Sequence, residues 1–181
     1  MANDLSAVPD VLFGTWKQLS GIYVDLETGE ERPGLSKAPN GYIHFARDGR
    51  MFNLTVDSSR QRPAGARPTA AEAEALYRSL IADTGTFGVD SDQVFFDLDV
   101  SWNESWTGTR QVRTFELKGN RLMISAEIIN PMTGKPARHR VCGSCPCGGG
   151  LGHRRNSGVL RDQLFERGSK LHPSTISSQF A

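Results

Sequence analysis

A pair of short hairpins constrains this chain more than any other feature of its sequence. Residues 41–57 read GYIHFARDGRMFNLTVD, and their Asp48-Gly49 dipeptide is typical of a two-residue turn, which needs positive φ at both positions. Such a turn predicts one apolar face and one mostly polar face, as a half-buried sheet requires. The pairs expected on the apolar face are Phe45 with Phe52 and Ile43 with Leu54.

A second hairpin follows the same logic over residues 112–128, VRTFELKGNRLMISAEI, with Gly119-Asn120 at the turn. Arg113 shares the parity of the apolar residues, so its guanidinium is expected on the apolar face of the sheet. The pairs expected on that face are Phe115 with Ile124 and Leu117 with Leu122.

Further strands are expected where β-forming residues gather or where apolar and polar positions alternate. These segments are residues 12–26, 84–89, 93–102 and 136–141. In the third segment, the alternation predicts that one side of the strand carries Phe96, Leu98, Val100 and Trp102.

One helix is expected between the third and fourth strands. Thr69 and Glu72 fit a capping box, in which the hydroxyl and the carboxylate each satisfy an exposed backbone N–H group. Apolar residues then recur at helical spacing, and Gly85 suits the end of the helix. The recurring residues are Ala73, Leu76, Tyr77, Leu80 and Ile81.

This order of elements predicts an all-β fold, an antiparallel up-and-down barrel of about eight strands with one inserted helix. A barrel of that size is filled by side chains or holds one small ligand. We expect an N-terminal extension at 1–10, the barrel at 11–141, and a Gly- and Cys-rich tail, disordered by its composition, at 142–181.

Charge and composition exclude several classes of function. A net charge of +1 argues against a protein that coats nucleic acid or an anionic membrane, since both need a basic face. The three cysteines and the absence of a secretory signal pattern indicate a reducing compartment, so the expected location is the cytoplasm. No nucleotide-binding or zinc-protease motif is present, and no cofactor is expected.

A series of short motifs, in this order, resembles the lipocalin-like domain family of bacteria and fungi. The motifs are Gly14-Thr15-Trp16, Gly41-Tyr42-Ile43, Asp48-Gly49-Arg50-Met51, Thr84-Gly85-Thr86-Phe87, Trp106-Thr107-Gly108-Thr109, Gln111-Val112-Arg113, Phe115-Glu116-Leu117 and Gly119-Asn120-Arg121-Leu122. The resemblance covers roughly residues 11–141 and implies a small calycin-type barrel with an internal pocket. It also implies a link to natural-product biosynthesis, where some related barrels act as cofactor-free isomerases or cyclases.

The resemblance also raises a question about the end of the barrel. Residues 138–141 look like the start of the last strand, but the sequence from Cys142 onward does not. A strand that stops there would leave an unpaired edge. In lipocalins the tryptophan corresponding to Trp16 packs at the closed end of the barrel against an arginine of the last strand, which here would be Arg138 or Arg140.

Arg113 and His44 are the candidate catalytic residues. A guanidinium on an apolar face needs a partner, and Arg113 either binds an acidic or carbonyl group of a ligand, has an internal partner, or reaches the barrel mouth. His44 lies on the polar parity and is then a surface histidine. If a bulge inverts that parity, His44 points inward and becomes a general acid–base candidate.

Aromatic side chains are expected to line the pocket, although ordinary core packing would explain them as well. These ligand-binding candidates are Phe45, Phe52, Phe96, Trp102, Trp106 and Phe115. Cys142, Cys145, Cys147 and His153 have the chemistry of zinc ligands, but their compressed, Gly-rich spacing favours a tail without metal.

The function expected first is binding of a small apolar molecule, a secondary-metabolite intermediate of polyketide or terpenoid type, with cofactor-free isomerisation or cyclisation inside the barrel. Arg113 would then stabilise a developing oxyanion. A carrier without chemistry, and an interaction module acting through residues 142–181, are the alternatives, because one scaffold hosts many functions.

Overall fold

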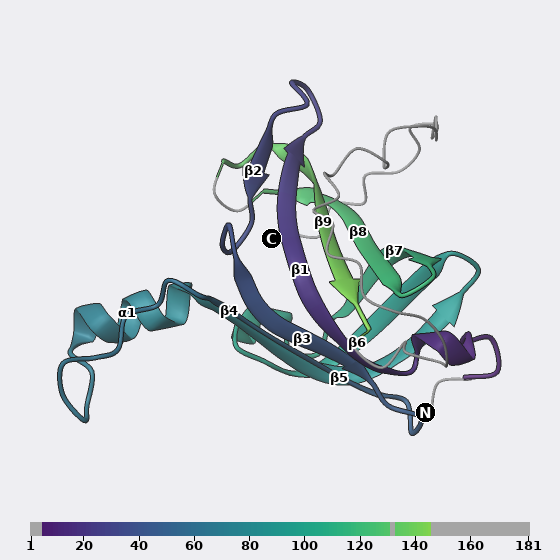
Figure 1. The fold of residues 1–181 in the computed structure, drawn as a ribbon, viewed down its shortest axis with the longest axis horizontal. Helices are drawn as coiled ribbons and strands as arrows, with labels where there is room; N and C mark the ends of the chain where they lie inside the picture. The colour runs from purple at the N-terminus through teal and green to yellow at the C-terminus, as the bar shows by residue number, and fades with distance from the viewer. Residues whose placement is uncertain (1–4, 131–132, 146–181) are drawn as a thin grey trace, which may run out of the picture. The chain divides into compact units, whose positions relative to one another are not determined.

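The computed structural model describes residues 5–130 and 133–145, which form a twisted antiparallel barrel (Figure 1). Its strands are β1 (Gly14–Asp25), β2 (Glu31–Pro33), β3 (Pro39–Phe45), β4 (Arg50–Asp57), β5 (Leu80–Asp90), β6 (Gln93–Ser101), β7 (Arg110–Lys118), β8 (Arg121–Ile129) and β9 (Pro136–Ser144). Its helices are α1 (Ala70–Arg78) and the short 3₁₀ turns η1 (Asp10–Leu12) and η2 (Glu104–Trp106).

The barrel is closed by hydrogen bonds between its last and first long strands. The strand order is β1-β3-β4-β5-β6-β7-β8-β9, and β9 pairs again with β1, while the short β2 pairs with the end of β1 outside this ring. Eight antiparallel strands therefore surround one interior, which confirms the predicted fold class. Closure also leaves no unpaired edge among these eight strands.

The expectation that the last strand stops at Val141 is wrong. β9 continues through Cys142 and Gly143 to Ser144, and it pairs with β8 on one side and β1 on the other. The sequence there lacks β-forming residues, but ladder hydrogen bonds join backbone groups, and two flanking strands supply them. A Cβ at Gly143 would lie 3.5 Å from the Cβ of Trp16, so this small residue passes directly beside the buried indole.

The first hairpin forms, but its predicted register is wrong by one residue. Gly49 has φ of +86°, whereas Asp48 does not have positive φ, so the two-residue turn cannot form. The connection spans residues 46–49 instead, with the Ala46 N–H donating to the Arg50 carbonyl at 2.8 Å. The observed pairs are Phe45 with Met51, His44 with Phe52, Ile43 with Asn53 and Tyr42 with Leu54.

The second hairpin has the predicted register. Gly119 has φ of +58°, and the strands on either side of the turn pair without a shift. The observed pairs include Phe115 with Ile124, Leu117 with Leu122 and Lys118 with Arg121. Arg113 therefore lies on the same face as the apolar residues of β7.

The inserted helix begins as predicted and ends earlier. The capping box between Thr69 and Glu72 is present, but α1 stops at Arg78, and Leu80 and Ile81 belong to β5. Pairing of β5 with β4 overrides the helical spacing, because each residue of β5 gains ladder hydrogen bonds and a place in the barrel wall. Figure 1 shows α1 standing to one side of the barrel, and none of its residues is buried.

A bulge changes the faces of β6. The register between β5 and β6 shifts between Thr84 and Gly85, so Val100 faces outward with 61% of its surface exposed. The predicted alternation is correct for Phe96 and Leu98, which are buried, and wrong for Val100. An extra residue in one strand of a ladder reverses the parity of everything beyond it.

The closed end of the barrel holds an apolar core. Trp16 is fully buried there and donates its indole N–H to the Leu12 carbonyl at 2.9 Å, so η1 covers that end. The buried apolar cluster comprises Val8, Leu12, Trp16, Phe45, Met51, Phe87, Val89, Val94, Phe96, Leu98 and Leu122. The opposite end, where β1 finishes and β9 starts, carries the polar interior residues.

Gly85 provides a test of this strand assignment. A Cβ at Gly85 would lie 2.0 Å from the Asp97 carbonyl oxygen, a backbone atom that cannot move without breaking the ladder. Gly85→Ala is therefore expected to lower the free energy of unfolding by about 2–3 kcal/mol, as overpacking does in a rigid core. Gly65→Ala is the matched control, since its Cβ would meet only the Arg67 carbonyl at 3.7 Å. Urea unfolding that finds both variants equally stable would contradict the assignment.

Candidate functional site

The open half of the interior is polar, in contrast to the core beneath it. Three of its ionisable side chains come from strands far apart in sequence: Tyr23 from β1, Asp83 from β5 and Arg113 from β7. His139 of β9 is the fourth. Each lies on the inward parity of its strand, as the register of the neighbouring pairs requires.

Tyr23 and His139 form a stacked pair on the wall where the barrel closes. They are directly opposite in the β1–β9 ladder, and their rings are 4.6 Å apart at an angle of 26°. Burial raises the pKa of Tyr23, and the charge of Arg113 partly opposes that rise. Burial, and then the Arg113 charge, lower the pKa of His139 to about 4. At neutral pH both rings are therefore uncharged.

Asp83 lies on the other side of the interior in a small hydrogen-bond network. It accepts a hydrogen bond from the Ser101 hydroxyl at 2.6 Å and another from the Asn53 amide at 3.4 Å. Burial raises the pKa of Asp83, while these two bonds and the Arg113 charge act against the rise. This carboxylate is the main negative charge acting on Arg113.

Arg113 is partly buried and donates to the Val112 carbonyl at 2.9 Å and to the Gln111 side chain. Burial lowers the pKa of its guanidinium, and Asp83 and Tyr23 counteract this. Within residues 5–130 and 133–145, no carboxylate lies within 4.0 Å of it, so it has no direct ion pair there. Its positive charge is thus only partly compensated, and the interior favours an anionic or strongly polar oxygen.

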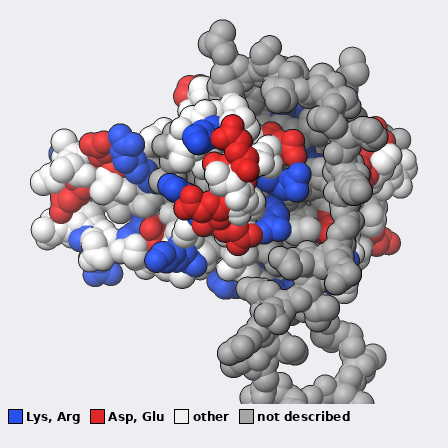
Figure 2. Space-filling model, turned by 90° about the horizontal axis from the view of Figure 1, so that it is seen from above, with Lys and Arg blue, Asp and Glu red and all other residues white. Residues whose placement is uncertain are grey.

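A hollow of about 140 Å³ lies at the open end of the barrel, and Tyr23 is one of the residues that line it. Tyr23 and Ala137 form its inner wall, and the remaining residues around it are Asp25, Thr28, Glu30, Arg32, Asn130, Thr133 and Lys135. Figure 2, seen from above, shows basic and acidic side chains intermixed on this side of the described residues rather than separated by sign.

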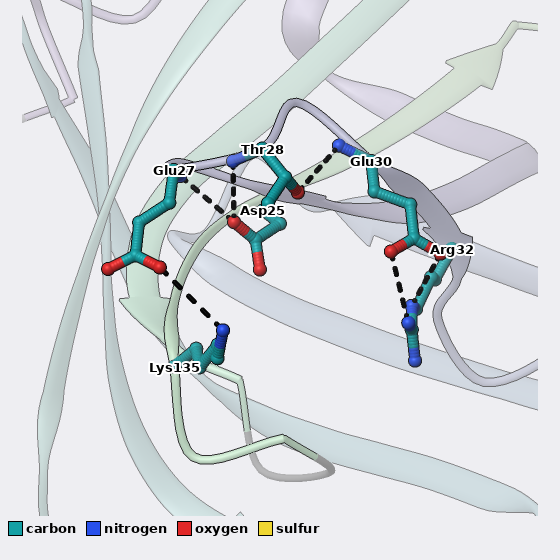
Figure 3. Close-up of polar contacts among 6 residues, drawn as sticks. All are labelled: Asp25, Glu27, Thr28, Glu30, Arg32 and Lys135. Carbon is teal, nitrogen blue, oxygen red and sulfur yellow. Dashed lines mark hydrogen bonds and ion pairs between the residues drawn. The ribbon is translucent and has the colours of Figure 1, made fainter.

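Local polar contacts hold the rim of this hollow (Figure 3). Asp25 accepts backbone N–H bonds from Glu27 and Thr28, both at 2.9 Å, and these bonds lower its pKa. Arg32 pairs with Glu30 at 3.0 Å, with both side chains more than half exposed. Exposed pairs of this kind stabilise little, but they leave the rim charges locally matched.

The predicted aromatic residues separate into two groups, one in the core and one beside α1. Phe45 and Phe96 stack at 6.2 Å in the buried cluster, and Phe115 packs against that cluster. Trp106 also packs against it, and lies 6.0 Å from Trp102 in an edge-to-face contact. The first three therefore form the floor beneath the polar half. Beyond the bulge in β6, inward Ser101 leaves Trp102 on the outer parity, where its ring lies 4.8 Å from that of Tyr77 of α1, so the expectation that Trp102 points inward is wrong.

His44 and Phe52 lie on the outer surface. They are opposite each other in the β3–β4 ladder, on the parity away from buried Phe45 and Met51. Phe52 is 51% exposed, and His44 contacts the Thr15 hydroxyl through Nδ1 at 2.8 Å. The β3–β4 ladder has no bulge, so the inversion that would turn His44 inward does not occur. The structure does not bring His44 near Arg113.

Trp16 is a core residue, as expected, but neither Arg138 nor Arg140 packs against it. Arg138 and Arg140 lie on the outer parity of β9, where they pair with Glu127 at 2.7 Å and Glu31 at 2.6 Å. The β9 residue on the Trp16 side is Gly143. The expected cation–π contact is therefore wrong, because the parity of β9 sends both guanidinium groups outward.

The candidate zinc ligands are only partly described. Cys142 and Cys145 have free thiols, whereas Cys147 and His153 lie outside the described residues. Among the described residues, no cluster of three or more His, Cys, Asp or Glu side chains is arranged to hold a metal ion. No helix in the same part of the chain has the length and hydropathy of a membrane span.

Sequence reasoning missed Tyr23, Asp83 and His139. His139 had a visible signal, since it alternates in phase with Ala137 and Val141. Asp83 was missed because the helical spacing continued through Ile81 and the next strand was expected only from residue 84. Tyr23 was hidden by the β1 bulge between Gln18 and Ser20, which moves it onto the face of Trp16.

A closed eight-stranded antiparallel barrel with a packed floor and a polar open half defines a lipocalin-like protein, and this fold suggests small-molecule binding. The model of the lipocalin-like domain family matches residues 13–142, and the chain belongs to that family. No curated protein matches the chain. A crystal structure of an uncharacterized protein from Bacteroides eggerthii is similar, with a TM-score of 0.39 and 13% identity over 74% of this chain and 99% of the other.

The low pKa of His139 links the site to stability. Between pH 6.5 and 4 the unfolded chain binds a proton at His139 that the folded barrel does not, so this contribution to stability is lost as the pH falls through that window. Between pH 7 and pH 4.5 the free energy of unfolding lost through His139 amounts to about 2 kcal/mol. Urea unfolding at both pH values should show that His139→Gln loses less stability than the parent. Equal losses would show that His139 has an ordinary pKa.

Proposed function

We propose that the open half of the barrel binds a small, largely apolar molecule through one oxygen-bearing acidic or carbonyl group, which Arg113 holds. The single observation that carries this proposal is the Arg113 guanidinium, which faces the interior without a direct carboxylate partner among the described residues. A planar, permanently charged fork in a poorly hydrated site is well suited to bind carboxylate or enolate oxygen.

The floor of the site supports an apolar body for the ligand. Phe96 and Phe115 lie below the polar groups and offer apolar surface. Such a division, with one polar anchor and an otherwise apolar lining, is usual for small-molecule sites. It fits a polyketide or terpenoid intermediate better than a sugar or nucleotide, which would need many polar partners.

We further propose that the bound molecule is rearranged, by cofactor-free isomerisation or cyclisation, rather than only carried. Arg113 would stabilise the oxygen on which negative charge develops, and the closed barrel would exclude water and hold a reactive conformer. Pure carriage is the alternative. A partner role for the tail falls mostly on residues 146–181, which lie outside the described residues.

Native mass spectrometry of the protein purified from its own source tests the first proposal and identifies the ligand. Incubation of that ligand with fresh protein, followed by chromatography, separates the two alternatives. A product of equal mass and changed retention supports isomerisation or cyclisation, and recovery of unaltered ligand supports carriage.

Arg113→Gln is expected to weaken binding of naphthalene-2-sulfonate, an apolar anion that stays charged across the working pH range, by about 10- to 100-fold, as loss of a charged hydrogen bond does. Arg110→Gln is the matched control, because Arg110 lies on the outer face of the same strand, paired with Asp97 at 2.6 Å. Isothermal titration calorimetry measures both. If the two variants bind the probe equally well, Arg113 is not the anchor.

A further inference from the structure

A row of inward-facing residues crosses four neighbouring strands beside Arg113. Thr114 pairs with Ser125 in the β7–β8 ladder, so the next position along places Arg113 beside Ala126. Ala126 pairs with His139 across β8 and β9, and His139 pairs with Tyr23 across β9 and β1. The row therefore reads Arg113, Ala126, His139, Tyr23.

Ala126 has the shortest side chain in this row. It ends at its Cβ, so no longer side chain of β8 stands between the guanidinium and the imidazole. Two strand spacings separate the Arg113 and His139 backbones, about 10 Å, and the long arginine side chain covers part of that distance. A carboxylate or sulfonate group has the size to lie over Ala126 and contact both residues.

Within residues 5–130 and 133–145, the structure gives the His139 ring a stacking contact and no side-chain or backbone hydrogen bond. The ring stacks on Tyr23, and its Nε2 lies against the backbone at Gly34, where a Cβ would be 3.6 Å away. Buried imidazoles normally have a hydrogen-bond partner. Because Nε2 faces Gly34, Nδ1 is the ring nitrogen that remains to donate a hydrogen bond to a ligand.

We propose that the ligand is an oxyanion held between Arg113 and His139 above Ala126, and that His139 takes up one proton as the anion binds. This rests on the proposed function and deepens it, because it assigns a second anchor and restricts the ligand to acids, or to molecules that become anionic in the site. Neutral His139 offers one N–H donor, and protonated His139 offers a charge as well.

The charged groups around His139 make the proton uptake specific to an anion. Arg113 of β7 is the charge that acts on the ring, Tyr23 of β1 is neutral, and β8 contributes uncharged Ala126. In the free barrel, burial and Arg113 hold the pKa of His139 at about 4. An anion bound between them cancels the Arg113 charge and adds its own attraction, so it raises that pKa. Asp83, on the far side of Arg113, is the competing site for a proton.

Calorimetry with naphthalene-2-sulfonate at pH 5.5, in buffers of different ionisation enthalpy, counts the protons taken up, since the sulfonate itself does not titrate. We expect uptake of a substantial fraction of one proton in the parent and in Asp83→Asn, and almost none in His139→Gln. Naphthalene-2-sulfonamide, the neutral analogue, should bind without uptake. Uptake that persists in His139→Gln, or disappears in Asp83→Asn, would overturn the assignment to His139.

A measurement on the parent protein guards against a variant that fails to fold. The Cε1–H resonance of His139, followed by NMR from pH 3.5 to 8, should titrate near 4 without the probe and at least one unit higher with it. For each unit by which the probe raises the pKa of His139, the probe binds tenfold more tightly at a pH below both pKa values than at a pH above them. If the titration midpoint of His139 does not change with the probe while binding is tight and depends on Arg113, His139 is not a second anchor. That result would leave the proposed function unaffected. Binding that is indifferent to Arg113→Gln would overturn both.

Ala126→Leu tests the position of the anion without changing any charge. The added side chain should fill the space between Arg113 and His139 and weaken binding of naphthalene-2-sulfonate at least tenfold. Ser125→Leu is the matched control, since Ser125 pairs with Thr114 and Arg140 on the outer face of the same strand. Equal affinity in the two variants would place the anion elsewhere.

Discussion

The ladder between β9 and β1 is the interaction on which the rest of this structure depends. It is formed by a segment, Pro136–Ser144, whose last residues carry little β-forming character, and it pairs with β1 from Lys17 to Asp25. Without it the sheet would have two open edges and no enclosed space. With it, the same eight strands have an inside, and Arg113, Asp83 and His139 come to share one environment.

Closure also explains why the interior divides into two halves. Trp16 and η1 cover one end, and the side chains above them form a close-packed floor. A barrel of eight strands has little space beyond its side chains, so the polar residues gather near the other end, where the mouth lets water or a ligand reach them. Burying Arg113 there without a direct carboxylate partner lowers stability, and such a residue is usually explained by what it binds.

The sequence predicts the wall of this barrel well and its interior only in part. Strand succession, the Gly119-Asn120 turn, the capping box of α1 and the inward parity of Arg113 all follow from local rules, and the structure has each of them. The errors have a common physical cause, which is register. A four-residue connection at Asp48-Gly49 moves Phe52 to the outside, and bulges in β1 and β6 turn Tyr23 inward and Val100 outward. One extra residue reverses the parity of everything beyond it, and no local pattern reports where such a residue lies.

A neutral histidine of low pKa beside a fixed positive charge has a chemical consequence whichever ligand occupies the barrel. Burial, and after it the Arg113 charge, keep the pKa of His139 low, so the ring is neutral at neutral pH. In the site we propose, negative charge that develops on a ligand oxygen near Arg113 would make His139 a stronger base. Enolisation of a carbonyl creates such a charge: a C–H bond breaks, the electron pair moves to the oxygen, and a nearby base takes the proton. Return of that proton to a different carbon completes an isomerisation with no cofactor. A protein that only carried a neutral apolar molecule would not need the proposed coupling, and an aliphatic residue at position 139 would cost less to bury than an imidazole.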